Sequence, residues 1–169
     1  MKIAMGTALA GSVRRYGRLG AMAAVATALV SVGFSSPAQA ATNPYTPQEA
    51  CHNEFGGSWS NVTDGHRSVV TTSGVKYGDV YLMYNGATGN NCVTTIKSLY
   101  VGSSTETGAW LDVKVSGGQS TYVDDHNYAY YAATQGYAAG HCVIYYAWIS
   151  NASGSDGASG GRYSWGNCG

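Results

Sequence analysis

The densest group of side chains that could do acid–base or metal chemistry is Asp124-Asp125-His126. Two carboxylates beside an imidazole could hold a calcium ion or supply a general base. The same residues are typical of a polar turn, here between Tyr122-Val123 and Tyr128, and we favour that interpretation. The sequence has no H-E-x-x-H zinc motif and no Gly-rich loop between a strand and a helix, and we expect no serine elbow. We therefore predict no catalytic residue, no metal site, no cofactor and no enzymatic activity.

Aromatic side chains are the other feature that could support function, because residues 41–169 carry thirteen Tyr and four Trp. In Tyr128–Tyr131 and Ile144–Trp148, adjacent residues of a strand must point to opposite faces, so at least one ring in each run faces away from the core. Exposed rings can stack on sugars, whereas the competing interpretation is a second packed layer between sheets. The candidate ligand-binding residues are Tyr128, Tyr130, Tyr131, Tyr145, Tyr146 and Trp148.

An even number of cysteines in a short exported chain predicts two disulfides. The four residues are Cys51, Cys92, Cys142 and Cys168. If Cys142–Ile149 and Arg162–Cys168 form a hairpin folded about Ser155, residues whose numbers add up to 310 face each other, and Cys142 then faces Cys168. Cys51 would pair with Cys92 in that case, although spacing alone leaves the other two connectivities open.

Residues 1–40 have the pattern of a cleavable signal peptide. A basic start is followed by an apolar run of about 16 residues, Leu19–Phe34, and then by small residues at Ala38 and Ala40. A bilayer span needs roughly 20 apolar residues, so we expect cleavage after Ala40 rather than a membrane anchor. The predicted organisation is a signal peptide, 1–40, and one secreted domain, 41–169, with no membrane association in the mature form.

Removal of the signal peptide changes the charge balance of the chain. Four of its nine Lys and Arg lie in residues 1–40, which leaves five against nine Asp and Glu, a formal net charge of −4. Nucleic-acid binding needs clustered cations, and these five are scattered. We therefore expect no nucleic-acid partner.

Short runs of Val, Ile, Thr, Tyr and Trp separated by Gly and Asn predict antiparallel strands. Asn85-Gly86 followed by Thr88–Asn91 predicts a hairpin, and Thr46–Glu49, with Pro at its second position, predicts one helical turn. The fold class is all-β, a single sandwich or barrel-like domain, and the pattern does not choose between the two. The predicted strands are Val69–Val75, Asp79–Tyr84, Cys92–Tyr100, Ala109–Val115, Ser120–Val123, Tyr128–Tyr131, Cys142–Ile149 and Arg162–Trp165.

Several segments together resemble one family of small exported proteins. They are Tyr45–Cys51, Gly78–Asn85, Thr88–Val93, Tyr128–Ala132, Ala139–Val143 and Cys168-Gly169. In order and content they are similar to the spore-associated protein A family of actinobacteria. The resemblance covers most of residues 41–169, and the chain departs from the family pattern after its first and third cysteines. It implies a secreted β protein of the aerial hypha or spore surface, without catalytic or ligand-binding residues to carry over.

These features lead us to expect a secreted structural protein associated with the spore or cell surface. One alternative is a glycan-binding module that uses exposed Tyr and Trp. Another is a secreted hydrolase or hydrolase inhibitor, for which the loop Asn151–Gly161 is a candidate protrusion. The expected partners are a spore-wall or cell-wall glycan or another surface protein.

Overall fold

A computed structural model describes residues 41–169, so the predicted signal peptide, 1–40, lies outside the described residues. The described part is mostly antiparallel β structure, which confirms the all-β prediction. Its elements are α1 (Pro47–Phe55), β1 (Ser60–Val70), β2 (Lys76–Asn85), β3 (Asn90–Lys97), β4 (Thr105–Val115), β5 (Gly118–Tyr128), β6 (Tyr131–Tyr137), β7 (Val143–Ser150) and β8 (Gly157–Gly166).

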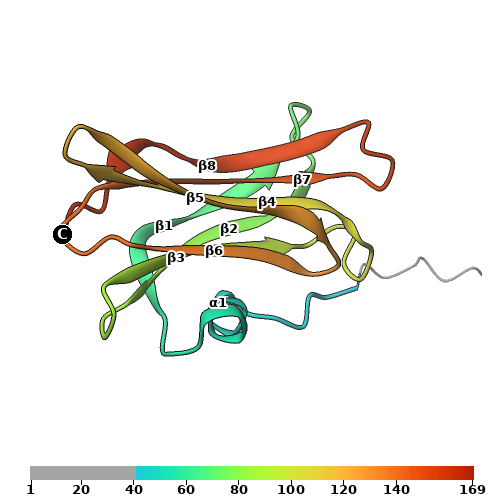
Figure 1. Ribbon diagram of the computed structural model, residues 1–169. Helices are drawn as coiled ribbons and strands as arrows, with labels where there is room; N and C mark the ends of the chain where they lie inside the picture. The colour runs from blue at the N-terminus through green and yellow to red at the C-terminus, as the bar shows by residue number, and fades with distance from the viewer. Residues whose placement is uncertain (1–40) are drawn as a thin grey trace, which may run out of the picture. The chain divides into compact units, whose positions relative to one another are not determined.

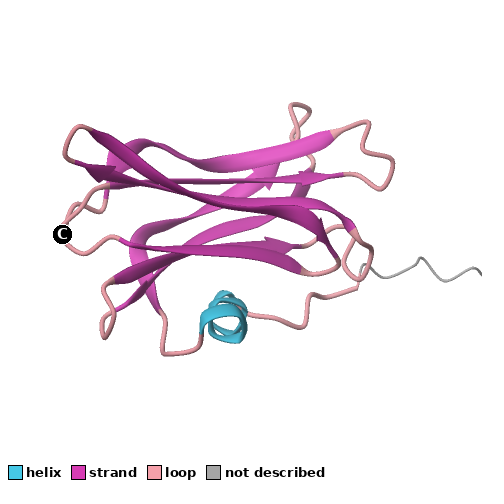
Figure 2. Cartoon of the chain, viewed as in Figure 1, coloured by secondary structure: helices cyan, strands magenta, loops and turns pink. Residues whose placement is uncertain are grey.

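The eight strands form one sheet in the order β5-β4-β7-β8-β1-β2-β3-β6. The sheet curls until its edge strands, β5 and β6, contact each other, which produces a nearly closed barrel (Figure 1). Figure 2 shows strands on opposite sides of the interior and helix α1 outside them. The structure therefore decides between the two architectures that the sequence left open.

Side chains that alternate along each strand fill the barrel. Val80 and Leu82 of β2, Val93 of β3, and Leu111 of β4 are buried in one cluster with the fully buried Tyr145 of β7. Burying a side chain of this size stabilises a fold by about 1.5 to 3 kcal/mol. The residues between them in sequence point outward, so the period-two pattern sets the two faces of the barrel wall.

The barrel closes where β5 meets β6. The Asp124 carboxylate of β5 accepts hydrogen bonds from the backbone N–H of Ala133 at 3.0 Å and from the Tyr128 hydroxyl at 2.6 Å. The ring of Tyr122 lies over Gly136 of β6, where even a Cβ atom would collide with it. A carboxylate and a ring thus join the two edge strands, and we call these contacts the seam.

The predicted turn at Asp124-Asp125-His126 is wrong, because all three residues lie within β5. They face Ala109, Gly108 and Thr107 of β4 in an unbroken register. Asp124 therefore shares the inner face of β5 with Tyr122, while Asp125 lies on the outer face. Neighbours on opposite faces of a strand cannot act together on one ion.

Helix α1 lies outside the barrel wall, beside β3 and β6 (Figure 1). Thr46 and Glu49 form a reciprocal capping box, and Pro47 occupies the first turn, as predicted. The helix continues beyond the predicted turn to Phe55 and is capped by Gly56, whose φ is 68°. Its buried face packs with Met83, Cys92 and Ala133, which point outward from three adjacent strands.

Both disulfides form as expected, Cys51 with Cys92 and Cys142 with Cys168. The predicted register of the last hairpin is wrong for most of its length, because Tyr145 faces Arg162 rather than Trp165. An irregularity between Val143 and Tyr145 shifts the pairing toward the expected one, so that Val143 faces Gly166. This shift brings Cys142 within reach of Cys168.

Most predicted strands are confirmed, as is the hairpin between β2 and β3, but two are misplaced. Most of Val69–Val75 is a tight turn in which Thr71 and Val75 share a backbone hydrogen bond, and Gly74 takes a φ of 86°. Tyr128–Tyr131 contains the turn from β5 to β6. The real strand there, Tyr131–Tyr137, was missed because its alanines and glycine have low strand propensity.

Lys97 is fully buried at the end of β3. Its ammonium group donates to Ser103 O at 2.7 Å, to Thr105 Oγ1 at 2.8 Å and to Tyr128 O at 3.0 Å. These bonds tie the loop after β3 and the end of β5 to one point. Burial lowers the pKa of Lys97 to about 8.

Asp124→Ala removes the shared acceptor of the seam and leaves the N–H of Ala133 without its partner. We expect a loss of about 1 to 3 kcal/mol in the free energy of unfolding by urea denaturation, with faster hydrogen exchange at Ala133. The matched control is Asp125→Ala, one residue away on the outer face. Equal losses for the two variants would contradict a special role for Asp124.

Lys97→Met tests the buried ammonium. Because the pKa of Lys97 is lower in the folded protein (about 8) than in the unfolded chain (~10.4), the unfolded chain binds more protons between these values, and stability rises with pH there. From pH 7.5 to 9.5 the wild type should gain about 1 to 2 kcal/mol relative to Lys97→Met in guanidinium titrations. Lys114→Met, at an exposed lysine, should keep the wild-type slope. Parallel pH profiles for wild type and Lys97→Met would refute the assignment.

Candidate functional site

The outer face of β4, β7 and β8 carries a row of aromatic side chains, which we call the aromatic strip. On β4 and β7 they point outward because they alternate with buried residues, as Trp110 does between Ala109 and Leu111. On β8 they share the face opposite to Arg162, which pairs with the buried Tyr145. The strip consists of Trp110, Tyr146, Trp148, Tyr163 and Trp165.

Neighbouring rings of the strip contact one another across the strands. The rings of Trp110 and Tyr146 stack with centroids 5.4 Å apart and planes 11° apart. Tyr163 continues the row 5.7 Å from Tyr146 at a tilt of 31°, and its side chain is 63% exposed. The ammonium of Lys114 lies 5.9 Å from the centre of the Trp165 ring. The rings thus extend across three adjacent strands and present open surface at the β8 side.

Gly108 makes room for two of these rings. A Cβ atom at this position would collide with the six-membered ring of Trp110 and come within 3.0 Å of Trp148. The Trp148 indole N–H donates to Asp125 at 3.4 Å, which holds that ring toward β5. Glycine is therefore required at the centre of β4 for a reason of packing rather than of backbone conformation.

The strip has little charge of its own. Burial, followed by the nearby carboxylate of Asp112, raises the pKa of the Tyr146 hydroxyl, so this group stays a neutral donor under physiological conditions. Asp112 is itself buried and accepts a hydrogen bond from Thr121 at 2.6 Å. Rings with neutral hydroxyl and indole groups suit contact with an uncharged, hydroxyl-rich ligand.

The structure divides the six predicted ligand-binding residues among three places. Tyr146 and Trp148 belong to the aromatic strip. Tyr145 has no exposed surface, and its hydroxyl donates to Asp64 O at 2.8 Å, so it is a core residue. Neighbours on one strand point to opposite faces, which is the alternation expected for this run.

Tyr130 and Tyr131 lie in a second, smaller aromatic group with Tyr45. The Tyr45 ring meets the other two edge-on, at 5.5 Å and 5.1 Å. The Tyr131 hydroxyl donates to Glu54 at 3.0 Å, and a shallow pocket of about 210 Å³ lies among these side chains. Tyr128 lines the same pocket, but its hydroxyl is committed to Asp124. This group joins the N-terminal segment to the β5–β6 turn.

Three members of the strip, Trp110, Tyr163 and Trp165, were not among the predicted site residues. A signal was present in the sequence, because Trp110 lies between Ala109 and Leu111, and because Tyr163 and Trp165 stand two residues apart and so share one face of a strand. What the sequence did not show is which strands are adjacent. Only the order β4-β7-β8 brings these rings together with Tyr146.

Two arrangements resemble hydrolase machinery without its geometry. Ser68, Asp79 and His66 lie together, but both Ser68 Oγ and His66 Nε2 bond the Asp79 carboxylate, at 3.4 Å and 2.7 Å, whereas a triad needs the serine bonded to the imidazole. Gly157–Gly161 has the G-x-S-x-G spacing, yet it lies inside β8 rather than at a strand-to-helix turn. Within residues 41–169, no group of three or more His, Cys, Asp and Glu side chains could hold a metal ion.

A comparison of the chain with protein-family models, curated proteins and solved structures found no match. The resemblance to the spore-associated protein A family therefore stays a prediction from the residues. In the part of the chain that the structure describes, no helix has the length and apolar character needed to cross a bilayer.

Gly108→Ala should displace the rings of Trp110 and Trp148 while leaving the core residues of β4 in place. We expect a changed near-ultraviolet circular dichroism spectrum, an unchanged far-ultraviolet spectrum, and a loss of about 1 to 3 kcal/mol in stability from overpacking. The control is Gly86→Ala, where the nearest atom lies 3.9 Å from the added carbon. If the two variants gave the same tryptophan signal, the described packing would be incorrect.

Proposed function

We propose that residues 41–169 form an exported, non-catalytic domain of the spore or cell surface, which attaches to polysaccharide through the aromatic strip. The observation that carries this proposal is the contact of Trp110, Tyr146 and Tyr163 in one outward-facing row across three strands. This proposal combines the predicted surface role with the glycan-binding alternative, because a protein of the cell or spore surface must be attached to that surface.

The chemistry of the strip favours sugars over other ligands. Aromatic faces stack on the apolar C–H faces of sugar rings, while hydroxyl and indole groups bond the sugar hydroxyls at the edge. Phosphate-rich ligands would require several clustered cations. The strip has a basic contact in Lys114, and one cation does not make such a cluster.

A surface location outside the cell rests on three features. The predicted signal peptide, 1–40, provides the route of export. Two disulfides are stable in oxidising compartments, and both are formed here. The resemblance to the spore-associated protein A family supports the spore surface in particular.

Trp110→Ala and Tyr163→Ala should weaken the binding of residues 41–169 to insoluble polysaccharide. A sedimentation assay would use purified actinobacterial cell wall, chitin and cellulose as separate probes. Loss of either ring should reduce the affinity for the bound polysaccharide about tenfold, the equivalent of ~1.4 kcal/mol.

Tyr137→Ala is the matched control, because Tyr137 is 57% exposed on β6, outside the strip. It should bind as the wild type does. The proposal fails if wild-type protein stays in the supernatant with all three polysaccharides, or if Tyr137→Ala weakens binding as much as Trp110→Ala.

A further inference from the structure

A pocket of about 430 Å³ opens at one end of the barrel. Ligand sites commonly occur in the mouths of β-barrels, and this volume lies within their usual range. It is lined by Ser60, Asn61, Val62, Tyr84, Asn91, Asn167, Cys168 and Gly169.

The inner wall of this pocket is built from three adjacent strands. Tyr84 of β2 faces Ser60 of β1 on one side and Asn91 of β3 on the other. Tyr84 also lies two residues beyond Leu82, so it belongs to the same inward face as the core. The pocket therefore continues the barrel interior, with polar groups and one ring in place of aliphatic side chains.

The last described residues, 167–169, form the opposite wall, and several bonds hold them there. Cys168 is bonded to Cys142, and Gly169 O accepts from the N–H of Gly140 at 3.0 Å. The Asn167 amide donates to Thr63 O at 2.9 Å. Bonds to the loop before β7 and to β1 therefore hold this wall in place.

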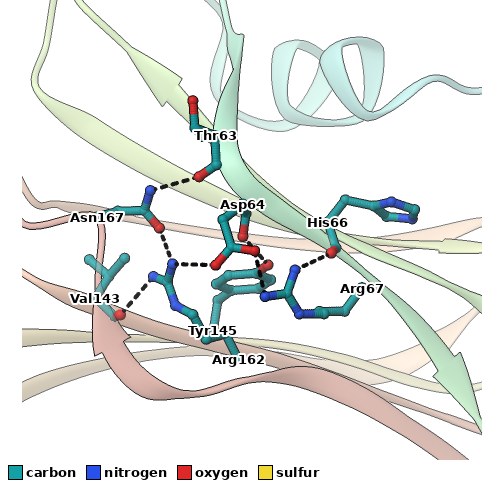
Figure 3. A network of polar contacts seen from close by, with 8 residues as sticks. All are labelled: Thr63, Asp64, His66, Arg67, Val143, Tyr145, Arg162 and Asn167. Atoms are coloured by element: carbon teal, nitrogen blue, oxygen red, sulfur yellow. Dashed lines mark hydrogen bonds and ion pairs between the residues drawn. The ribbon is translucent and has the colours of Figure 1, made fainter.

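A network of charged side chains behind the wall fixes Asn167 further (Figure 3). The guanidinium of Arg162 donates to Asn167 Oδ1 and, at 3.0 Å, to Val143 O, and it lies 5.3 Å from the Tyr145 ring. Asp64 pairs with Arg162 at 3.5 Å. These charges bond one another, so they stiffen the wall and do not line the pocket.

Asn91 is similarly preorganised. It is only 6% exposed, and its amide Nδ2 donates to Met83 O at 3.0 Å, which sets the plane of the amide. Placing polar groups before a ligand arrives lowers the entropic cost of binding. Rigid amides on two opposite walls are thus available to one ligand.

None of the eight lining residues has a charged side chain. Two amides (Asn91 and Asn167), two hydroxyls and one aromatic ring match an uncharged ligand that carries several hydroxyl groups and an apolar ring face. The Asn61 amide is bonded to Gln48 of α1, outside the barrel. The buried Asn91 amide uses one N–H on Met83 O, so an apolar ligand would leave its second N–H and its carbonyl oxygen without partners, at a cost of about 1 to 3 kcal/mol for each buried group. We infer that the barrel mouth binds a single sugar residue, with Tyr84 against its ring face and the asparagine amides at its hydroxyls.

This inference goes beyond the proposed function, because the mouth shares no residue with the aromatic strip. In the proposed function, the aromatic strip binds several consecutive sugar residues of a polysaccharide on the outer face, whereas the barrel mouth binds one sugar residue. Either site can therefore fail while the other stands.

The test is a titration of isotope-labelled residues 41–169 with glucose and with N-acetylglucosamine, followed by NMR. We expect shifts at the side-chain amides of Asn91 and Asn167 and little change at the indole N–H of Trp110. Ser60→Ala, at an exposed residue that faces Tyr84 across the strands, and Tyr84→Leu, which keeps apolar bulk but removes the ring, should each weaken binding about tenfold. Trp110→Ala should leave the affinity of the mouth unchanged.

Each outcome decides the matter. If neither sugar shifts the amides of the mouth at millimolar concentration, the pocket holds only water and the inference is overturned. Shifts confined to the indole groups would overturn it too, while supporting the aromatic strip. If Tyr84→Leu proves unfolded, the Ser60→Ala affinity still decides, and an unchanged affinity would exclude sugar binding at the mouth.

Discussion

A sheet can enclose a core only if its two edge strands meet, and in this domain the meeting depends on Asp124. One carboxylate oxygen accepts the Ala133 N–H of β6, and the other accepts the Tyr128 hydroxyl of its own strand. The ring of Tyr122 crosses the same boundary over Gly136. Closure gives every strand an inner and an outer face, and these two faces define both proposed sites. The aromatic strip consists of outward-facing side chains on three strands. The barrel mouth is lined by inward-facing side chains at the end of the barrel, where the aliphatic core stops.

Charged residues are few, and several of them hold the structure together. Lys97 is buried among three oxygen acceptors at one end of β3. Asp64, which has a φ of 59°, pairs with Arg67 at 2.6 Å and with Arg162, and so pins the irregular part of β1 to the last strand. The two proposed sites carry few charged side chains and are rich in aromatic, hydroxyl and amide groups. This is the physical reason that an uncharged, hydroxyl-rich ligand fits both sites better than an ionic one.

Local features of the fold were predictable where the cause is local. Thr46, Pro47 and Glu49 specify the start of α1 within four residues, and Asn85-Gly86 specifies a hairpin. Period-two alternation correctly placed Tyr145 and Tyr146 on opposite faces. The alternation did not say which face was the core, so Tyr145 was included in a binding set although it is buried. Strand β6 was missed because its small residues suit the space beside Tyr122 and α1 rather than an intrinsic strand preference.

The sequence by itself determined the all-β class, the helix start and the presence of outward-facing rings, because each depends on near neighbours or on strand alternation. It favoured the observed pairing of cysteines but left the other two connectivities open. Only the tertiary structure decided that the sheet closes into a barrel, that Asp124 and Asp125 serve opposite faces, and that Trp110, Tyr146 and Tyr163 form one row. It also placed Ser60, Tyr84 and Asn91 beside the last residues of the chain. These features depend on which strands are neighbours, and strand order is set by the packing of residues far apart in sequence.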